Sequence, residues 1–519
     1  MSYIQPNSRI EFFDDIGISQ DYNDTLYFET LAQKDNYFST INRLAHVDRC
    51  YYVRERRGFV RVELPMNTMI HAQYMRFQNT SYGLKWWYAF VTDVIYINDN
   101  TTEVQFELDP MLSWMGEFSL SECFVERQHS LTDEIGDNLV PENFELGDYI
   151  NELRVVGGHM QNKKIMLAQT PVKLADGTYA NEGGLYGGIY SGLGYKVYNT
   201  PSEVNAVIEG LSEVKRQDEL IQIMMIPSDF VCEAGSTTPQ QYSVSVTKPY
   251  TSVGGYTNVR NKKLFTYPYK FLSIYNCEGE NIDLKYEYFA NETCDFYLRG
   301  IMNLEPVIMC LPRSYMGEGL SYPNAISMRN FPKCSWASDT YKAYLAQLGS
   351  STASNVMATA LPAVASAGLA VATGGTSLLV DAAKVGAVGV GKEISNLLAG
   401  VAIPPPMPNK AHGVQTSDIL YAGDNKEFYF YQKSIRGETA KIIDNYFTMF
   451  GYADRTVHVP NMNARQRFTY VKTVGCKINC ACPASDADFI EGLFNKGIRF
   501  WKDHTQIGSY SDDNLPLGG

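Results

Sequence analysis

The stretch WWYAFVTDVIYINDNTTEVQFELD, residues 86–109, decides the fold class of this chain. Its first half, from Trp86 to Ile97, is dense in aromatic and β-branched residues, which favour strands. Asn98-Asp99-Asn100 has the composition of a turn. From Thr101 onward apolar and polar residues alternate, as in a strand with one packed face. The stretch therefore predicts a long antiparallel hairpin that suits a barrel or tube wall.

The second strand of this hairpin has two chemically different faces. Its apolar face, which we expect to pack, consists of Val104, Phe106 and Leu108. Its other face is a row of mostly acidic side chains, Glu103, Gln105, Glu107 and Asp109. A nearby stretch, Gly58 to Leu64, alternates in the same way, with Arg61 and Glu63 on its polar face. One face of this sheet is therefore predicted to be buried and the other exposed.

The composition of the whole chain agrees with a mainly β protein. The 519 residues include 36 Tyr and 25 Phe, and the net charge is −13. This charge argues against non-specific nucleic-acid binding through a basic surface. The ten cysteines follow a polar N-terminus without a signal peptide, so reduced buried thiols are expected. Cys476, Cys480 and Cys482 lack the paired spacing of a structural zinc site, although a metal site there stays an alternative.

Shifts in composition divide the chain into five segments. We predict an N-terminal β tube domain (1–128), an inserted α+β domain (129–265), a β-rich domain (266–337), an apolar Gly/Ala-rich loop (338–408) and a C-terminal β tube domain (409–519). Within them, three helices are predicted, one over about 202–215 capped by Ser202, one over 338–348 that leads into the apolar run, and one over about 486–496. A final strand should carry Phe500 and Trp501.

Residues 343–380 contain no charged side chain, in a chain that is otherwise polar. A first arm, Val356 to Thr373, approaches the ~20 residues that a membrane-spanning helix needs. A second arm, Leu378 to Ile403, carries four ionisable groups and would more naturally line a pore than face lipid. Three interpretations follow: regulated membrane insertion, a permanent anchor, or a buried Ala/Gly hairpin or linker.

Blocks at both ends of the chain carry a resemblance to a known family. They are residues 77–92 (FQNTSYGLKWWYAFVT), 106–109, 113–115 and 123–129 near the start, and 468–473, 494–501 and 507–510 near the end. In these blocks the chain resembles the tail knob, or distal tail tube, proteins of small short-tailed phages of the phi-twenty-nine group. The apolar loop stands in the same late-middle place, whereas residues ~130–330 cannot be matched.

The resemblance implies a homo-hexamer closed into a tube at the distal end of the tail of a virion, made in the host cytoplasm. Phage DNA would pass through the lumen without specific binding, and other tail proteins (the lower collar or tail tube) would lie above. The apolar loops would plug the tube and then form a pore in the host cytoplasmic membrane. The residues implied in insertion are Met357, Leu361, Val364, Leu369, Val371, Leu378, Leu379, Val380, Val385, Val388, Val390, Ile394, Leu397 and Leu398.

A conduit for DNA also gives the acidic row of the hairpin a function. Glu103, Glu107 and Asp109 would repel phosphates and keep DNA from sticking to the wall. A solvated outer face of a sheet would carry the same residues, so both interpretations stay open.

No enzymatic motif is found in the sequence. None of the seven histidines stands in an HExxH or other metal-binding spacing, and no nucleophile elbow is present. We therefore expect no enzyme, no catalytic residues, no metal and no cofactor. The alternatives from other classes are a tail-associated peptidoglycan hydrolase and a receptor-binding adhesin.

Overall fold

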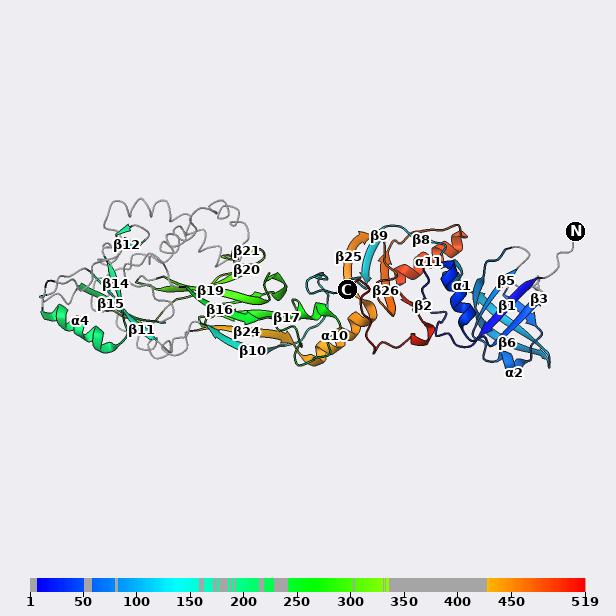
Figure 1. The fold of residues 1–519 in the computed structure, drawn as a ribbon, viewed down its shortest axis with the longest axis horizontal. Coiled ribbons are helices and arrows are strands. Elements are labelled where there is room, and N and C mark those ends of the chain that lie inside the picture. The colour runs from blue at the N-terminus through cyan, green and yellow to red at the C-terminus, as the bar shows by residue number, and fades with distance from the viewer. Residues whose placement is uncertain are drawn as a thin grey trace. The chain divides into compact units, whose positions relative to one another are not determined.

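The computed structural model describes residues 7–50, 58–79, 83–157, 163–170, 175, 177, 185–186, 189–190, 193–213, 219–227, 241–301, 304–329, 331, 333–335 and 427–518. These residues are mainly in strands with few helices, which confirms the mainly β part of the predicted fold class, while its assembly into a ring stays a prediction (Figure 1). The chain forms two compact units. Unit 1 combines residues 1–147, 255–264 and 436–519, and unit 2 combines residues 148–254 and 265–435.

Unit 1 begins with a six-stranded sheet. Its elements in chain order are β1 (Ser8–Phe13), β2 (Asp24–Leu26), α1 (Leu31–Thr40), β3 (Ala45–Cys50), β4 (Phe59–Val62), α2 (Met66–Met69), β5 (Tyr74–Asn79), β6 (Trp87–Asn98), β7 (Thr101–Leu108), α3 (Pro110–Trp114), β8 (Ser119–Leu120) and β9 (Cys123–Gln128). The sheet order is β3-β1-β5-β6-β7-β4. Strands β6 and β7 form the predicted hairpin, and β4 adds its alternating residues to the outer edge of β7.

A five-stranded sheet joins the two ends of the chain inside unit 1. The C-terminal elements are α10 (Gly437–Phe450), β25 (Tyr452–His458), β26 (Phe468–Val474), β27 (Ile478–Asn479), α11 (Ala484–Lys496), β28 (Ile498–Trp501) and the short 3-10 helix η7 (His504–Gln506). The sheet order is β2-β28-β26-β9-β25, so N-terminal β9 lies between two C-terminal strands. Figure 1 shows this as a cyan strand beside orange ones. β27 pairs with N-terminal β8 in a separate two-stranded sheet.

One apolar core is shared by the six-stranded and the five-stranded sheets of unit 1. Phe13, Phe38 and Tyr74 from the N-terminal part pack in the same buried cluster as Phe468 and Trp501 from the C-terminal part. The Phe468 and Trp501 rings stack with centroids 4.2 Å apart. Because long aromatic side chains bury large areas, this shared core is what makes the chain's two ends one unit.

Unit 2 consists of the middle of the chain. Its elements are β10 (Tyr149–Gly157), β11 (Lys163–Gln169), β12 (Leu185–Tyr186), β13 (Ile189–Tyr190), β14 (Gly194–Tyr198), α4 (Pro201–Glu213), β15 (Leu220–Pro227), β16 (Gln241–Thr247), β17 (Lys270–Tyr275), β18 (Asn281–Leu284), η4 (Tyr286–Tyr288), β19 (Thr293–Ile301), β20 (Val307–Tyr315), β21 (Glu318–Leu320), β22 (Ile326–Met328), β23 (Lys333–Ser335) and β24 (Phe428–Ile435). η3 (Lys262–Phe265) spans a boundary between the units.

The sheets of unit 2 are antiparallel. Two have four strands, in the orders β10-β24-β17-β18 and β14-β11-β15-β23, and one has five, β16-β19-β20-β21 with β22 on β20. β12 and β13 form a short pair of their own. Strand β24, which follows the apolar segment in sequence, lies between β10 and β17. Residues separated by almost three hundred positions therefore share one sheet.

The helices of both units partly match the sequence predictions. The predicted helix over 486–496 corresponds to α11, and the one over 202–215 corresponds to α4. The prediction that Ser202 caps α4 is wrong, because the Thr200 hydroxyl accepts from Glu203 N while the Glu203 carboxylate accepts from Asn199 N. This pair resembles a capping box, except that the Glu203 carboxylate accepts from the residue before the cap and not from the cap itself. Helix α10 was not predicted, because the segment after residue 409 was expected to be β-rich.

The boundaries of the two units do not coincide with those of the five predicted segments. Segments 1–128 and 409–519 both contribute to unit 1, and residues 148–254 and 265–435 form unit 2. Whether each segment acts as a separate functional domain stays a prediction. Among the helices that the structure describes, none is both long and apolar enough to cross a bilayer.

Candidate functional site

The acidic row predicted on the β6–β7 hairpin is the first candidate site. In the structure, Glu103 and Asp109 are not exposed as predicted. Glu103 lies directly opposite Arg61 of β4. Arg61 Nε donates to Glu103 Oε2 at 2.7 Å, and the Glu103 side chain is only 10% exposed. The positive charge across the strand offsets this carboxylate, so Glu103 contributes little negative potential to the face.

Asp109 has turned inward at the end of the hairpin. The prediction that Leu108 packs and Asp109 is exposed is wrong, because Leu108 is 46% exposed and Asp109 is 1% exposed. The alternation stops there since β7 ends at Leu108 and α3 begins at Pro110. As N-cap of α3, Asp109 accepts from Leu112 N at 3.1 Å, and it also accepts from the Tyr74 hydroxyl at 2.8 Å. A carboxylate so enclosed has no surface to present to a lumen.

Burial sets the protonation of Asp109. Burial raises the pKa of its carboxyl to about 6, against the hydrogen bonds from Tyr74 and Leu112 that lower it. Glu107, in contrast, is exposed and accepts a bond from Gln20 Nε2 at 3.3 Å. Of the three residues predicted to line a conduit, Glu107 is the one that presents its charge to solvent, and its lining role stays a prediction.

A buried lysine that the sequence analysis missed fixes α1 beside this corner. Lys34 Nζ donates to Leu112 O at 2.9 Å and to Met115 O at 2.8 Å. These are carbonyls at the C-terminal end of α3, which lack partners within so short a helix. Burial lowers the pKa of Lys34 to about 8. No alternation pattern marks a lysine as buried, so composition and periodicity could not have found it.

The second candidate site is the junction that holds the two ends of the chain in one sheet. Directly after β9, His129 Nδ1 accepts from Tyr470 N at 2.8 Å, and its Nε2 lies 3.0 Å from Thr448 O. The first bond makes Nδ1 the acceptor, so Nε2 carries the proton and donates. Burial lowers the pKa of His129 to about 3, which keeps the ring neutral near neutral pH.

A buried polar network extends this junction. The Tyr452 hydroxyl donates to Asp133 Oδ1 at 2.7 Å and lies 3.1 Å from Asn261 Oδ1. Asn261 Nδ2 donates to Asp444 Oδ1 at 2.9 Å, and Asp444 is fully buried. The network ties residues 255–264 to α10 and to the segment after β9. Buried polar networks of this kind specify one arrangement of the chain when their members are satisfied.

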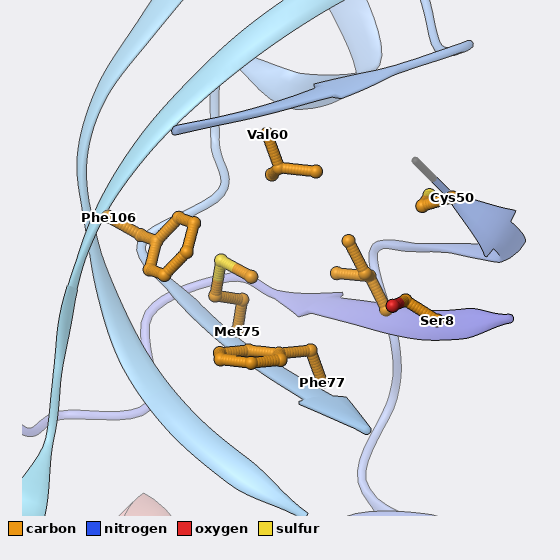
Figure 2. A pocket seen from close by; sticks show the side chains of 7 residues that line it. Ser8, Cys50, Val60, Met75, Phe77 and Phe106 are labelled. Carbon is orange, nitrogen blue, oxygen red and sulfur yellow. The ribbon is translucent and has the colours of Figure 1, made fainter. Parts of the chain in front are cut away.

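Two further features of the described residues are the cysteines and a small apolar cavity. Eight cysteines in the described part of the chain form no disulfide, and burial raises the pKa of Cys476, which lies beside Cys123, to about 12. Within the described ranges, no three His, Cys, Asp or Glu side chains cluster as metal ligands. Figure 2 shows the cavity in the six-stranded sheet, lined by Ser8, Ile10, Cys50, Val60, Met75, Phe77 and Phe106. Its volume of about 10 Å³ is what one water needs, so it is no ligand site.

The residues predicted to insert into a membrane lie outside the described residues. This applies to the whole set from Met357 to Leu398 and to the helix expected just before it. Their role therefore stays a prediction.

Comparison with known proteins places the chain in a family. The family model described as "Bacillus phage phi29, Tail knob protein gp9, C-terminal domain" matches residues 234–515. A second model, "Caudoviral major tail protein N-terminus", matches residues 6–119. The chain is also 23% identical to tail knob protein gp9 of Bacillus phage phi29 and 22% identical to that of Bacillus phage PZA, covering 99% of this chain and all of each relative.

The fold has a counterpart among solved structures. The tail knob protein gp12 of bacteriophage C1 superposes with a TM-score of 0.61 at 14% identity, covering 98% of this chain and 100% of that one. The phi29 family model spans more than half of the 519 residues. The chain is therefore a phage tail protein, and it belongs to the family of tail knob proteins represented by gp9 of Bacillus phage phi29.

Proposed function

We propose that this chain is the subunit of a hexameric tube at the distal end of a phage tail, through which DNA is ejected. In this proposal the apolar loops plug the tube, leave it on infection and form a pore in the host cytoplasmic membrane. The single observation that carries the membrane step is the run of residues 343–380 without a charge. In a tail protein, such a run has few uses other than burial in an assembly or in lipid.

Features of unit 1 support the conduit part of the proposal. A tube wall must hold its shape while DNA passes, and the five-stranded sheet joins both chain ends through a common aromatic core. The net charge of −13 and the exposed Glu107 suit a wall that phosphates do not bind. The pairing of Glu103 with Arg61 means that overall charge, rather than a row on one strand, would supply the repulsion.

Electron microscopy of the purified protein tests the tube. We expect ring-shaped particles with sixfold symmetry and a plugged centre. A protein that stays monomeric at high concentration, with and without detergent, would contradict the tube.

Dye release from liposomes tests the pore separately. A variant with residues 343–403 replaced by a Gly/Ser linker should still form rings but release no dye. A matched pair of variants divides the loop. Serines at Leu361, Val364 and Leu369 should abolish release, because the uncharged first arm is the part that suits lipid. Serines at Val385, Val388 and Val390 should reduce it less. Unchanged release and DNA ejection without the loop would eliminate the pore and leave the tube intact.

A further inference from the structure

One face of a sheet in unit 2 carries tyrosines and cations together. In β24 the residues Phe428 and Phe430 point into the core of unit 2, and the alternate residues Tyr429, Tyr431 and Lys433 point to the opposite face. The register of the neighbouring strands adds Tyr275 opposite Tyr429 and Arg154 opposite Tyr431. We call these five side chains, with Tyr149 at the end of the same sheet, the tyrosine face.

Five of the six side chains of the tyrosine face, all except Tyr149, contact one another. The Tyr275 and Tyr431 rings meet edge to face with centroids 5.3 Å apart, and the Tyr429 and Tyr431 rings stack at 6.2 Å. The Arg154 guanidinium lies 5.2 Å from the Tyr429 ring centroid, and Lys433 Nζ lies 4.8 Å from that of Tyr275. These contacts hold the rings and cations in place before any partner arrives, so binding would immobilise little more.

The exposure and composition of this face resemble those of a protein interface. Tyr149 is 41% exposed, Arg154 is exposed, and Tyr275, Tyr429 and Tyr431 are partly exposed. Tyrosine and arginine are the residue types enriched in interface hot spots, since they bury large areas at little entropic cost. An ordinary solvated strand would carry short polar or charged residues at these positions instead.

The charges decide what kind of partner fits. A nucleic acid or another polyanion needs a groove with many cations, and single-strand binding needs free ring faces for stacking. Here two cations stand among four tyrosines, and they already lie over the rings of Tyr429 and Tyr275. The register also places the exposed Asp283 of β18 on this face, which further disfavours a polyanion. A protein surface with a moderate negative charge fits better. The chain itself carries a net charge of −13, so a second copy has that character.

We propose that the tyrosine face is the surface on which the next copy of this chain docks in the assembly. The inference rests on the ring of the proposed function and names one of its contact surfaces. In a closed ring each copy presents two different surfaces to its neighbours, so the tyrosine face would meet an acidic surface elsewhere on the adjacent copy.

Light scattering of the full chain after size exclusion tests the inference. The double variant Arg154→Glu/Tyr431→Ala should raise the dissociation constant of the assembly at least about tenfold, as expected for the loss of interface anchors. The matched control is Arg313→Glu/Tyr297→Ala, which removes a similar pair (guanidinium 5.3 Å from the ring centroid) from a different sheet of unit 2. The control should assemble like the wild type, and circular dichroism should show both variants folded.

Cross-linking provides a readout that does not depend on variants. A zero-length carbodiimide links lysine to carboxylates, so an assembly mixed from light and heavy isotope-labelled chains should give mixed-label links from Lys433 to an Asp or Glu. If the wild type assembles and the tyrosine-face variant assembles equally, the inference is wrong while the tube stands. If that variant instead loses binding to a single-stranded oligonucleotide, the partner is nucleic acid. A wild-type chain that never assembles would overturn the tube itself.

Discussion

Arg61 and Glu103 lie directly opposite each other on neighbouring strands of the six-stranded sheet, and their side chains form a 2.7 Å ion pair. Because Arg61 is 59% exposed at its side chain, solvent screens the pair. We expect a coupling of about 0.2–1 kcal/mol between Arg61→Ala and Glu103→Gln in a double-mutant cycle of urea unfolding. Additive effects of the two substitutions would show that the pair makes no contribution to stability.

Asp109 makes the stability of unit 1 depend on pH. Its folded-state pKa of about 6 lies above the ordinary 3.8. The group therefore favours the folded state below its unfolded pKa, and this contribution is lost as the pH rises through about 6. The unfolding free energy of the wild type relative to Asp109→Asn should fall by roughly 2–3 kcal/mol between about pH 4 and about pH 8.

Thermal unfolding at several pH values measures this difference. Asn keeps a side-chain oxygen that can cap α3, so the variant should fold. Its stability should lack only the pH dependence that the Asp109 carboxyl contributes. Parallel pH curves for the wild type and the variant would mean that Asp109 does not titrate in this range.

His129 gives the opposite dependence on pH. Burial lowers its folded pKa from 6.5 to about 3. Its contribution to stability is therefore present above its unfolded pKa and is lost as the pH falls toward about 3, since the unfolded state takes up the proton first. His129→Phe leaves Thr448 O and Tyr470 N without their partner, which should cost about 1–3 kcal/mol at neutral pH. In denaturant titrations, the difference in unfolding free energy between the wild type and His129→Phe should become smaller as the pH falls. A difference that does not change with pH would contradict this account.

Gly451 is required by close packing between the chain ends. It ends α10 with φ +66°, and a Cβ there would lie 2.2 Å from Gln128 O. Gly451→Ala should therefore lose about 3 kcal/mol or more and separate β25 from β9. Gly475 is the matched control, since it has φ +70° but nothing within 4 Å of its Cβ position. Gly475→Ala should cost only about 1–2 kcal/mol in the same unfolding experiment. Equal losses would show that backbone conformation, not the contact, is decisive.

The burial of a side chain was predicted correctly where the alternation of its own strand sets it, and wrongly where another element does. The alternation in β7 correctly placed Val104 and Phe106 in the core. It failed at Leu108 and Asp109, where the chain changes from strand to helix and the capping requirement of α3 outweighs the period of two. Arg61 was recognised on the polar face of its strand, but the sequence could not show which residue of β7 it opposes.

Helix α10 shows a different limit. Its buried positions Ala440, Ile443 and Phe447 have helical spacing, and Gly451 stands at its end, so the signal was present. The aromatic strands on either side led to a β-rich prediction for the whole segment. The tyrosine face could not be predicted from the sequence, because its members come from β10, β17 and β24, which are far apart in the sequence.

The sequence by itself determined the mainly β class, the central hairpin, the helix α11, the unusual uncharged run and the family, because these depend on local periodicity, composition and residue order. Only the tertiary structure decided that β9 lies between β26 and β25, that Asp109 and Lys34 are buried, and that Glu103 is paired. The physical reason is that strand pairing and burial are set by contacts between residues far apart in the sequence, from 35 positions for Tyr74 and Asp109 to 326 for Gln128 and Asp454. No local pattern encodes which distant segment supplies the partner.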